Sequence, residues 1–131
     1  MPAYGRTSEI ISYAKWKTTY DDSGSITWIY RHNDSSLAQN AADWARRNYW
    51  NYNGGGTQTV FPTYSLTGGT LGVTDPSYCS KLVWQSYYYA GYNVVRTPLL
   101  TGVINPYYLR PEHISTLWNK KPELVATITT Y

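Results

Sequence analysis

The chain has 131 residues, enough for one domain with a hydrophobic core and too few for two ordinary domains. Its net charge of +3 comes from scattered Lys and Arg residues and is too small to indicate a nucleic-acid partner. No apolar run approaches the roughly 20 residues that a membrane-spanning helix needs, and a single cysteine excludes an internal disulfide.

The first third of the chain predicts one strand preceded by a short helical piece. Residues 8–13 are expected to form a short strand or an extended lead-in, and residues 15–20 a helical turn carrying a packed Trp16. Residues 21–25 have the composition of a solvated turn. Residues 26–31 are rich in β-branched and aromatic side chains and predict a strand.

An amphipathic helix is predicted over residues 35–48, capped by Asp34 or Ser35. The residues expected on its inner face are Leu37, Ala41, Trp44 and Ala45. Residues 49–72 predict irregular structure, and a loop of this length in a small domain is usually functional or mobile.

The single cysteine belongs to the next predicted helix, which begins just before Cys79 and ends at Gly91. Asp75 or Ser77 is the expected N-terminal cap, with Pro76 in the first turn and Gly91 at the C-terminal cap. Helical spacing places Cys79 at the head of a buried stripe. The members of this stripe are Cys79, Leu82, Val83, Ser86, Tyr87 and Ala90.

The last third of the chain predicts short strands and short helices. Residues 93–96 predict a short strand or extended segment, residues 105–109 a capped short helix, and residues 111–119 a further helix. Residues 124–131 alternate apolar and Thr side chains and predict a closing strand. The pattern is that of a single α+β domain over residues 1–131, with a small antiparallel sheet packed against helices.

The predicted position of Cys79 has a chemical consequence. A cysteine in the first turn of a helix meets the positive end of the helix dipole and several N–H groups without intrahelical partners. Both favour the thiolate, which is the nucleophilic form, and cysteine hydrolases of the papain type need this placement. The alternative is that Cys79 is a small buried apolar residue without chemistry, the usual role of a free cysteine.

The segment Tyr78-Cys79-Ser80-x-Leu82-Val83-Trp84 is the most specific motif in the chain. Together with weaker segments in the same order, it resembles the circularly permuted branch of the NlpC/P60 papain-like superfamily. The weaker segments are Lys15-Trp16, Arg31, Ala42-x-Trp44-Ala45, Tyr49, Tyr52-Asn53 and Pro106-x-x-Leu109. The resemblance extends over residues 12–124 and implies a papain-like fold with the cysteine at a helix N-terminus.

The resemblance implies a cysteine-dependent hydrolase or acyltransferase with Cys79 as the nucleophile. In such proteins a histidine acts first as base and then as acid, and backbone N–H groups hold the oxyanion. NlpC/P60 relatives commonly cleave bacterial cell-wall peptides, and the permuted branch includes proteins similar to lipid acyltransferases. No metal or other cofactor is expected, because one cysteine and two histidines without a carboxylate cluster make a poor zinc site.

The histidine is the missing part. In the permuted branch the histidine strand precedes the segment that resembles residues 2–20, so we expect the histidine and the third polar residue to lie upstream of Met1. His32 and His113 are the alternatives within the chain, although each is first expected to face solvent or to pack in the core. The loop residues expected either to line the cleft near Cys79 or to serve only the loop are Asn51, Tyr52 and Asn53.

Two hypotheses on function follow. The first is an amide hydrolase that acts on cell-wall peptides, and the alternative is a truncated or non-catalytic domain that binds cell-wall glycopeptide or a protein partner. The 15 Tyr and 6 Trp of the chain suit the binding of glycopeptide or protein. The polar, lysine-poor composition favours an extracellular or cell-envelope location. Residues 1–6 lack the apolar stretch of a signal peptide. A domain without its N-terminal strand leaves a sheet edge uncovered, which predicts a homodimer through that edge.

Overall fold

The computed structural model describes residues 8–20, 24–67, 69–92, 102–111 and 122–130. The elements in chain order are α1 (Tyr13–Tyr20), β1 (Ile26–His32), α2 (Ser35–Tyr49), α3 (Cys79–Tyr89), the 3-10 helix η1 (Pro106–Leu109) and β2 (Pro122–Thr129). These helices and strands confirm the α+β class. The elements predicted over residues 93–96 and 111–119, and the Asp21-Asp22 turn, fall wholly or almost wholly outside the described residues.

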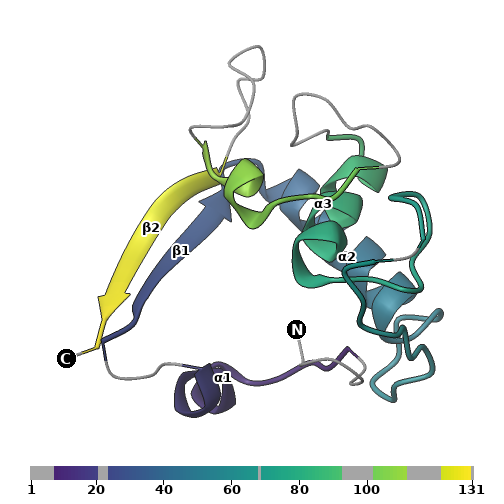
Figure 1. The fold of residues 1–131 in the computed structure, drawn as a ribbon, viewed down its shortest axis with the longest axis horizontal. Helices are drawn as coiled ribbons and strands as arrows, with labels where there is room; N and C mark the ends of the chain where they lie inside the picture. The colour runs from purple at the N-terminus through teal and green to yellow at the C-terminus, as the bar shows by residue number, and fades with distance from the viewer. Residues whose placement is uncertain (1–7, 21–23, 68, 93–101, 112–121, 131) are drawn as a thin grey trace.

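The two strands form an antiparallel sheet. The register runs from Ile26 opposite Thr129 to His32 opposite Pro122, with an irregularity between Ile29 and Tyr30. Figure 1 shows this sheet standing to one side of the helix pair α2 and α3. The strands predicted over residues 26–31 and 124–131 are therefore present. The expected packing of the sheet against helices is limited to the His32 end, because most other strand residues are exposed or half-buried.

Each strand has an outer edge that pairs with no other strand in the described part of the chain. Backbone N–H and C=O groups on such an edge can pair with a further strand. The homodimer predicted through this edge stays a prediction.

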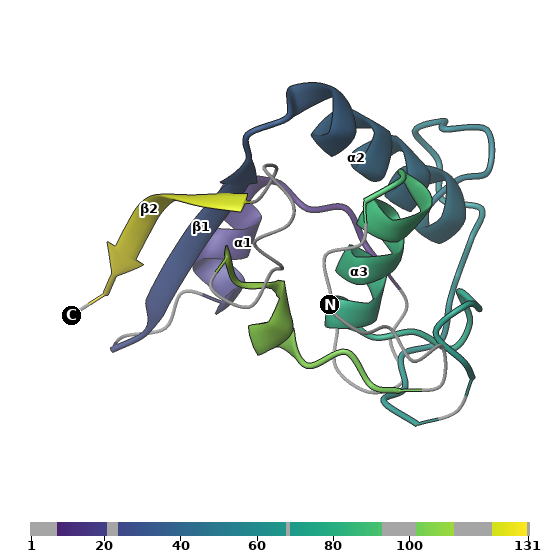
Figure 2. The ribbon, with the colours of Figure 1, turned by 90° about the horizontal axis from the view of Figure 1, so that it is seen from above.

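The N-terminal segment is attached to the rest of the chain at Ser8, whereas α1 lies apart (Figure 2). Ser8 is buried, its hydroxyl donates to the Tyr49 carbonyl, and its carbonyl accepts from Gln58 Nε2 at 2.8 Å. Residues 8–12 have no regular secondary structure, as expected for an extended lead-in, and α1 is longer than the single turn predicted. No residue of α1 is buried, and the ring of Trp16 stacks on that of Tyr13 with 5.8 Å between centroids. Figure 2, seen from above, shows α1 beneath the sheet and separate from α2 and α3.

Helix α2 follows the sequence prediction closely. The Asp34 carboxylate accepts a hydrogen bond from the Leu37 N–H at 2.9 Å, as an N-terminal cap should. Ala41 is buried on the predicted inner face, where the other expected residues are at least half-buried. The face also includes Tyr49 at the last turn, which is buried.

Helix α3 begins at Cys79 itself, and Tyr78 is its N-terminal cap residue. The predicted capping by Asp75 or Ser77 and the first-turn role of Pro76 are therefore wrong. The Asp75 carboxylate instead accepts from the Thr63 N–H at 2.8 Å, which ties it to the preceding loop. The helix ends at Tyr89 with Ala90 as its C-terminal cap residue, two residues before the predicted end. Gly91 follows with a φ of 95°, a conformation that glycine adopts without strain.

The buried face of α3 agrees with the predicted stripe at Ser86 and differs at its other members, of which Leu82, Tyr87 and Ala90 are half-buried. Cys79 and Val83 are exposed, whereas the buried residues are Ser80, Lys81, Trp84, Gln85 and Ser86. A pattern based on apolar side chains cannot find this face, because most of its members are polar. Burial is tolerated because their side chains hydrogen-bond to backbone carbonyls of neighbouring segments.

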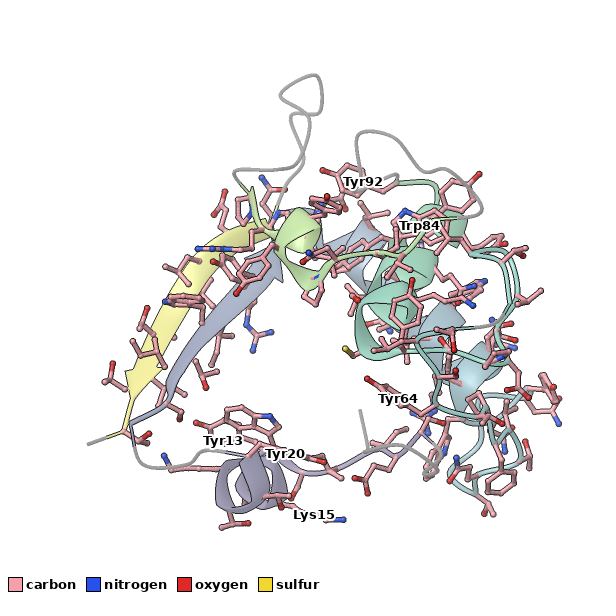
Figure 3. The ribbon with its side chains drawn as sticks, in the orientation of Figure 1. Tyr13, Lys15, Tyr20, Tyr64, Trp84 and Tyr92 are labelled. Atoms are coloured by element: carbon pink, nitrogen blue, oxygen red, sulfur yellow. The ribbon has the colours of Figure 1, made fainter. Side chains whose placement is uncertain are left out.

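The core gathers around α3. Its buried members are Leu71, Tyr78, Trp84, Tyr92 and Ile104. Figure 3 shows Trp84 and Tyr92 together at one end of the molecule, far from Tyr13 and Lys15 on α1. The predicted short helix is present as η1, capped by the side chain of Asn105, which accepts from the Tyr107 N–H at 3.0 Å.

Candidate functional site around Cys79

Cys79 is exposed at the first residue of α3 and lines a cavity of about 530 Å³. It does not belong to the buried face of its helix, so the interpretation of Cys79 as an inert core residue is wrong. The thiol is instead placed where a solute can reach it. In the described part of the chain, no side chain forms a hydrogen bond with Cys79 Sγ.

The walls of this cavity come from three separate segments. The lead-in contributes Ser8, Glu9 and Ile11, α1 contributes Trp16 and Tyr20, and α3 contributes Leu82 and Val83 beside the cysteine. Of these residues, the sequence pointed to Cys79, to Leu82 and Val83 of its motif, and to Trp16. The lead-in residues carried no signal of their own, because only the folded chain brings them opposite α3.

The backbone before Cys79 is held from several directions. The Ser77 N–H donates to the Thr63 carbonyl at 2.9 Å, and the Ser65 N–H donates to the Ser77 carbonyl at 2.9 Å. The Tyr78 hydroxyl accepts from the Ile104 N–H at 2.9 Å, while the Ser80 hydroxyl donates to the Ile104 carbonyl at 2.6 Å. The first turn of α3 is thus fastened to two loops, although its cap residue provides no side-chain hydrogen bond.

A buried polar network lies directly behind this turn. The Tyr49 hydroxyl donates to Gln85 Oε1 and lies 2.7 Å from Ser77 Oγ. Because its one hydroxyl proton is used toward Gln85, we infer that Ser77 donates to Tyr49. Gln85 Nε2 in turn donates to the carbonyls of Leu71 at 2.6 Å and Val73 at 2.8 Å. The network joins α2, α3 and the loop between them.

Burial raises the pKa of Tyr49 to about 12, against a lowering effect of its hydrogen bond with Ser77. The phenol therefore stays protonated over the neutral range and remains a donor to Gln85. Burial also lowers the pKa of Lys81, although the nearby Asp75 carboxylate opposes this. Lys81 is only 1% exposed, and its ammonium donates to the Pro76 carbonyl at 2.8 Å.

His32 is buried at the end of β1 and does not line the cavity that contains Cys79. It lines a different cavity of about 430 Å³, together with Arg31 and Tyr87. Its Nδ1 accepts from the Asp34 N–H at 3.0 Å, so that nitrogen carries no proton. Its ring packs on Tyr87 and, edge to face, on Tyr92 at 5.0 Å. The expectation of a core histidine is confirmed for His32, whereas His113 lies outside the described residues.

The loop residues near position 52 serve the loop rather than the cavity. Asn51 is buried, with Nδ2 donating to the Thr57 carbonyl at 2.6 Å and Oδ1 accepting from the Asn53 N–H at 2.8 Å. Tyr52 is exposed. None of the three is among the described residues that line the Cys79 cavity, so of the two expected roles the structural one is correct.

Metal ligands do not cluster in the described ranges, which contain no group of three or more His, Cys, Asp or Glu side chains that could hold a metal ion. These ranges also contain no helix whose length and apolar character would let it cross a membrane.

The chain is similar to an uncharacterized 30.3 kDa protein of Bacillus thuringiensis. The two are 32% identical over 127 residues, which cover 97% of this chain and 46% of the relative. The chain thus spans about half the length of that protein. No model of a known protein family matches the chain, and no solved structure matches it either.

Proposed function

We propose that this chain carries the nucleophile of a cysteine-dependent amide hydrolase, with Cys79 in that role and peptides of the bacterial cell wall as substrates. The observation that supports this best is the exposure of Cys79 at the first residue of α3, inside a cavity of substrate size. The resemblance of the segment 78–84 to the permuted NlpC/P60 branch supports the same role. An extracellular or cell-envelope location belongs to the proposal.

The chemistry uses the start of the helix. The Cys79 thiolate attacks the carbonyl carbon, a C–S bond forms, and the amine leaves with a proton from the conjugate acid of the base. Water then cleaves the thioester and regenerates the thiol. The first backbone bond of α3 joins the Leu82 N–H to the Tyr78 carbonyl, so the three preceding N–H groups are available donors for the oxyanion.

The base must come from elsewhere than His32, which lines a different cavity. The family resemblance assigns it to a histidine upstream of Met1, and His113 is the alternative within the chain. The proposal therefore separates two properties. The accessibility of the thiol depends on residues that the structure describes. Catalytic turnover of a substrate needs the histidine as well.

The test compares Cys79 with an ordinary helical thiol. A matched control protein carries Cys79→Ser together with Gln39→Cys, which places a thiol on an exposed position of α2. We expect iodoacetamide to alkylate Cys79 about tenfold faster than the control thiol at neutral pH, measured by intact mass. We also expect cell-wall peptide hydrolysis by a chain that carries the histidine strand in front of residue 1, and we expect this hydrolysis to disappear in Cys79→Ser. Equal alkylation rates and no hydrolysis would contradict the proposal.

A second candidate is a non-catalytic domain that binds cell-wall glycopeptide. The observation that favours it is the exposure of aromatic rings on Tyr52, Tyr88 and Tyr89, since such rings stack on sugars and peptides. Binding to purified wall fragments that is unchanged in Cys79→Ala, without any acyl adduct on the wild-type thiol, would favour this candidate over the hydrolase.

A further inference from the structure

The cavity beside Cys79 has mostly apolar walls. Aliphatic or aromatic residues of the described lining lie on both sides, with Ile11, Trp16 and Tyr20 from the N-terminal segment and Leu82 and Val83 from α3. The other described lining residues are Ser8, Glu9 and Cys79. Leu82 and Val83 lie about one turn beyond Cys79 on the same helix, so they flank the thiol. A group bound against them would therefore sit next to the carbonyl that the thiol attacks.

The charge in this cavity is already compensated. Glu9 is the acidic residue of the described lining, and its Oε2 lies 3.3 Å from Lys15 Nζ in a salt bridge. A charged substrate group would have to compete with that pair, or be desolvated against aliphatic and aromatic side chains. The walls therefore suit an uncharged apolar group better than a cationic or anionic one.

The apolar lining continues past the cavity. A second hollow of about 290 Å³ shares Ser8, Glu9 and Leu82 with the first one. It extends to Ala45 and Trp50 at the end of α2. The two hollows adjoin on either side of the lead-in, which is a suitable arrangement for an extended chain that carries apolar side chains.

We infer that this cavity binds an apolar side chain adjacent to the scissile carbonyl of a peptide substrate, with Trp16, Leu82 and Val83 as specificity-determining residues. The inference rests on the proposed function of Cys79 and narrows its substrate. Peptides with an uncharged apolar residue next to the cleaved bond are preferred over those with a charged residue there. The apolar walls supply the preference, because they remove that side chain from water.

The test uses iodoacetamides that differ in the nitrogen substituent: hydrogen, isobutyl, benzyl, carboxymethyl and dodecyl. The alkylation rate of Cys79 is divided by the alkylation rate of glutathione with the same reagent. This division removes the intrinsic reactivity of each reagent from the comparison. We expect a ratio about tenfold higher for isobutyl and benzyl than for hydrogen, and a lower ratio for the anionic carboxymethyl reagent. Val83→Asp should abolish the preference. Val125→Asp, the same change at an exposed position of β2, should preserve it.

Val83 is itself 39% exposed, so its substitution should not unfold the chain. Trp16→Ala, on a helix without buried residues, gives an independent variant with the same expected loss. A ratio that does not depend on the substituent would overturn the inference. A ratio that keeps rising to dodecyl would overturn it in favour of a long acyl chain. Alkylation needs no histidine, so this selectivity can be measured even if the protein does not hydrolyse peptides. Hydrolysis without selectivity among the reagents would contradict this inference and leave the proposed function standing.

Discussion

The hydroxyl of Tyr49, at the last residue of α2, lies 2.7 Å from Ser77 Oγ, two residues before Cys79. Both side chains are buried, as is Gln85, which accepts the Tyr49 proton. The position of the thiol thus depends on a polar contact between the end of one helix and the residue before the cap of another. The predictions below concern this polar network, the titration of its tyrosine, and His32.

Gln85→Met should lower the free energy of unfolding by about 2–4 kcal/mol. Methionine fills a similar volume, but the buried Leu71 carbonyl and the Val73 carbonyl lose their donor, and Tyr49 loses its acceptor. Urea denaturation followed by circular dichroism measures the change. The control is Gln39→Met, because Gln39 is exposed on α2 and bonds only to the Asp43 carboxylate. Equal effects of the two substitutions would show that the buried network contributes little.

Stability should fall at alkaline pH because of the buried tyrosines. The pKa of Tyr49 rises from 10.0 in the unfolded chain to about 12 in the folded one. The contribution of Tyr49 to the free energy of unfolding is therefore complete below pH 10. As the pH rises from about 10 to about 12, this free energy falls by about 2–3 kcal/mol. Burial also raises the pKa values of Tyr78, Tyr87 and Tyr92, which act in the same direction.

Lys81 acts in the opposite direction, since its lowered pKa means that stability increases as the pH rises toward 10.5. Tyr49→Phe should thus lower stability at neutral pH, through the lost hydrogen bonds, and weaken the decline above pH 10. Tyr52→Phe, at an exposed ring, is the control and should leave the curve unchanged. Denaturation curves at a series of alkaline pH values measure both. A decline as steep in Tyr49→Phe as in the wild type would contradict the assignment to Tyr49.

His32→Asn should leave the alkylation rate of Cys79 within about twofold of the wild type, because His32 lines another cavity. Asparagine can still accept the Asp34 N–H, but it loses the ring contacts with Tyr87 and Tyr92. We expect a loss of about 1–2 kcal/mol of stability. Asn33→Ala, at an exposed neighbour, is the control. A tenfold slower alkylation of the folded His32→Asn variant would instead assign His32 a direct role at the thiol.

The elements whose signals are local could be predicted from the sequence. Asp34 caps α2, Gly91 follows the end of α3 and Asn105 caps η1, each through a contact within a few residues. Such signals act over one or two turns and hold where no distant segment competes for the capping side chain. The predicted cap at Asp75 failed for that reason, because its carboxylate accepts from the Thr63 N–H instead.

The sequence by itself therefore determined that the chain forms an α+β domain with its one cysteine at a helix start. Only the tertiary structure decided which face of α3 is buried, since Lys81 and Gln85 become core residues through carbonyls supplied by distant segments. It also decided that Cys79 faces a cavity shared with Glu9 and Trp16, and that His32 does not line that cavity. The physical reason is that burial of a polar side chain depends on partners far away in sequence, which no local pattern records.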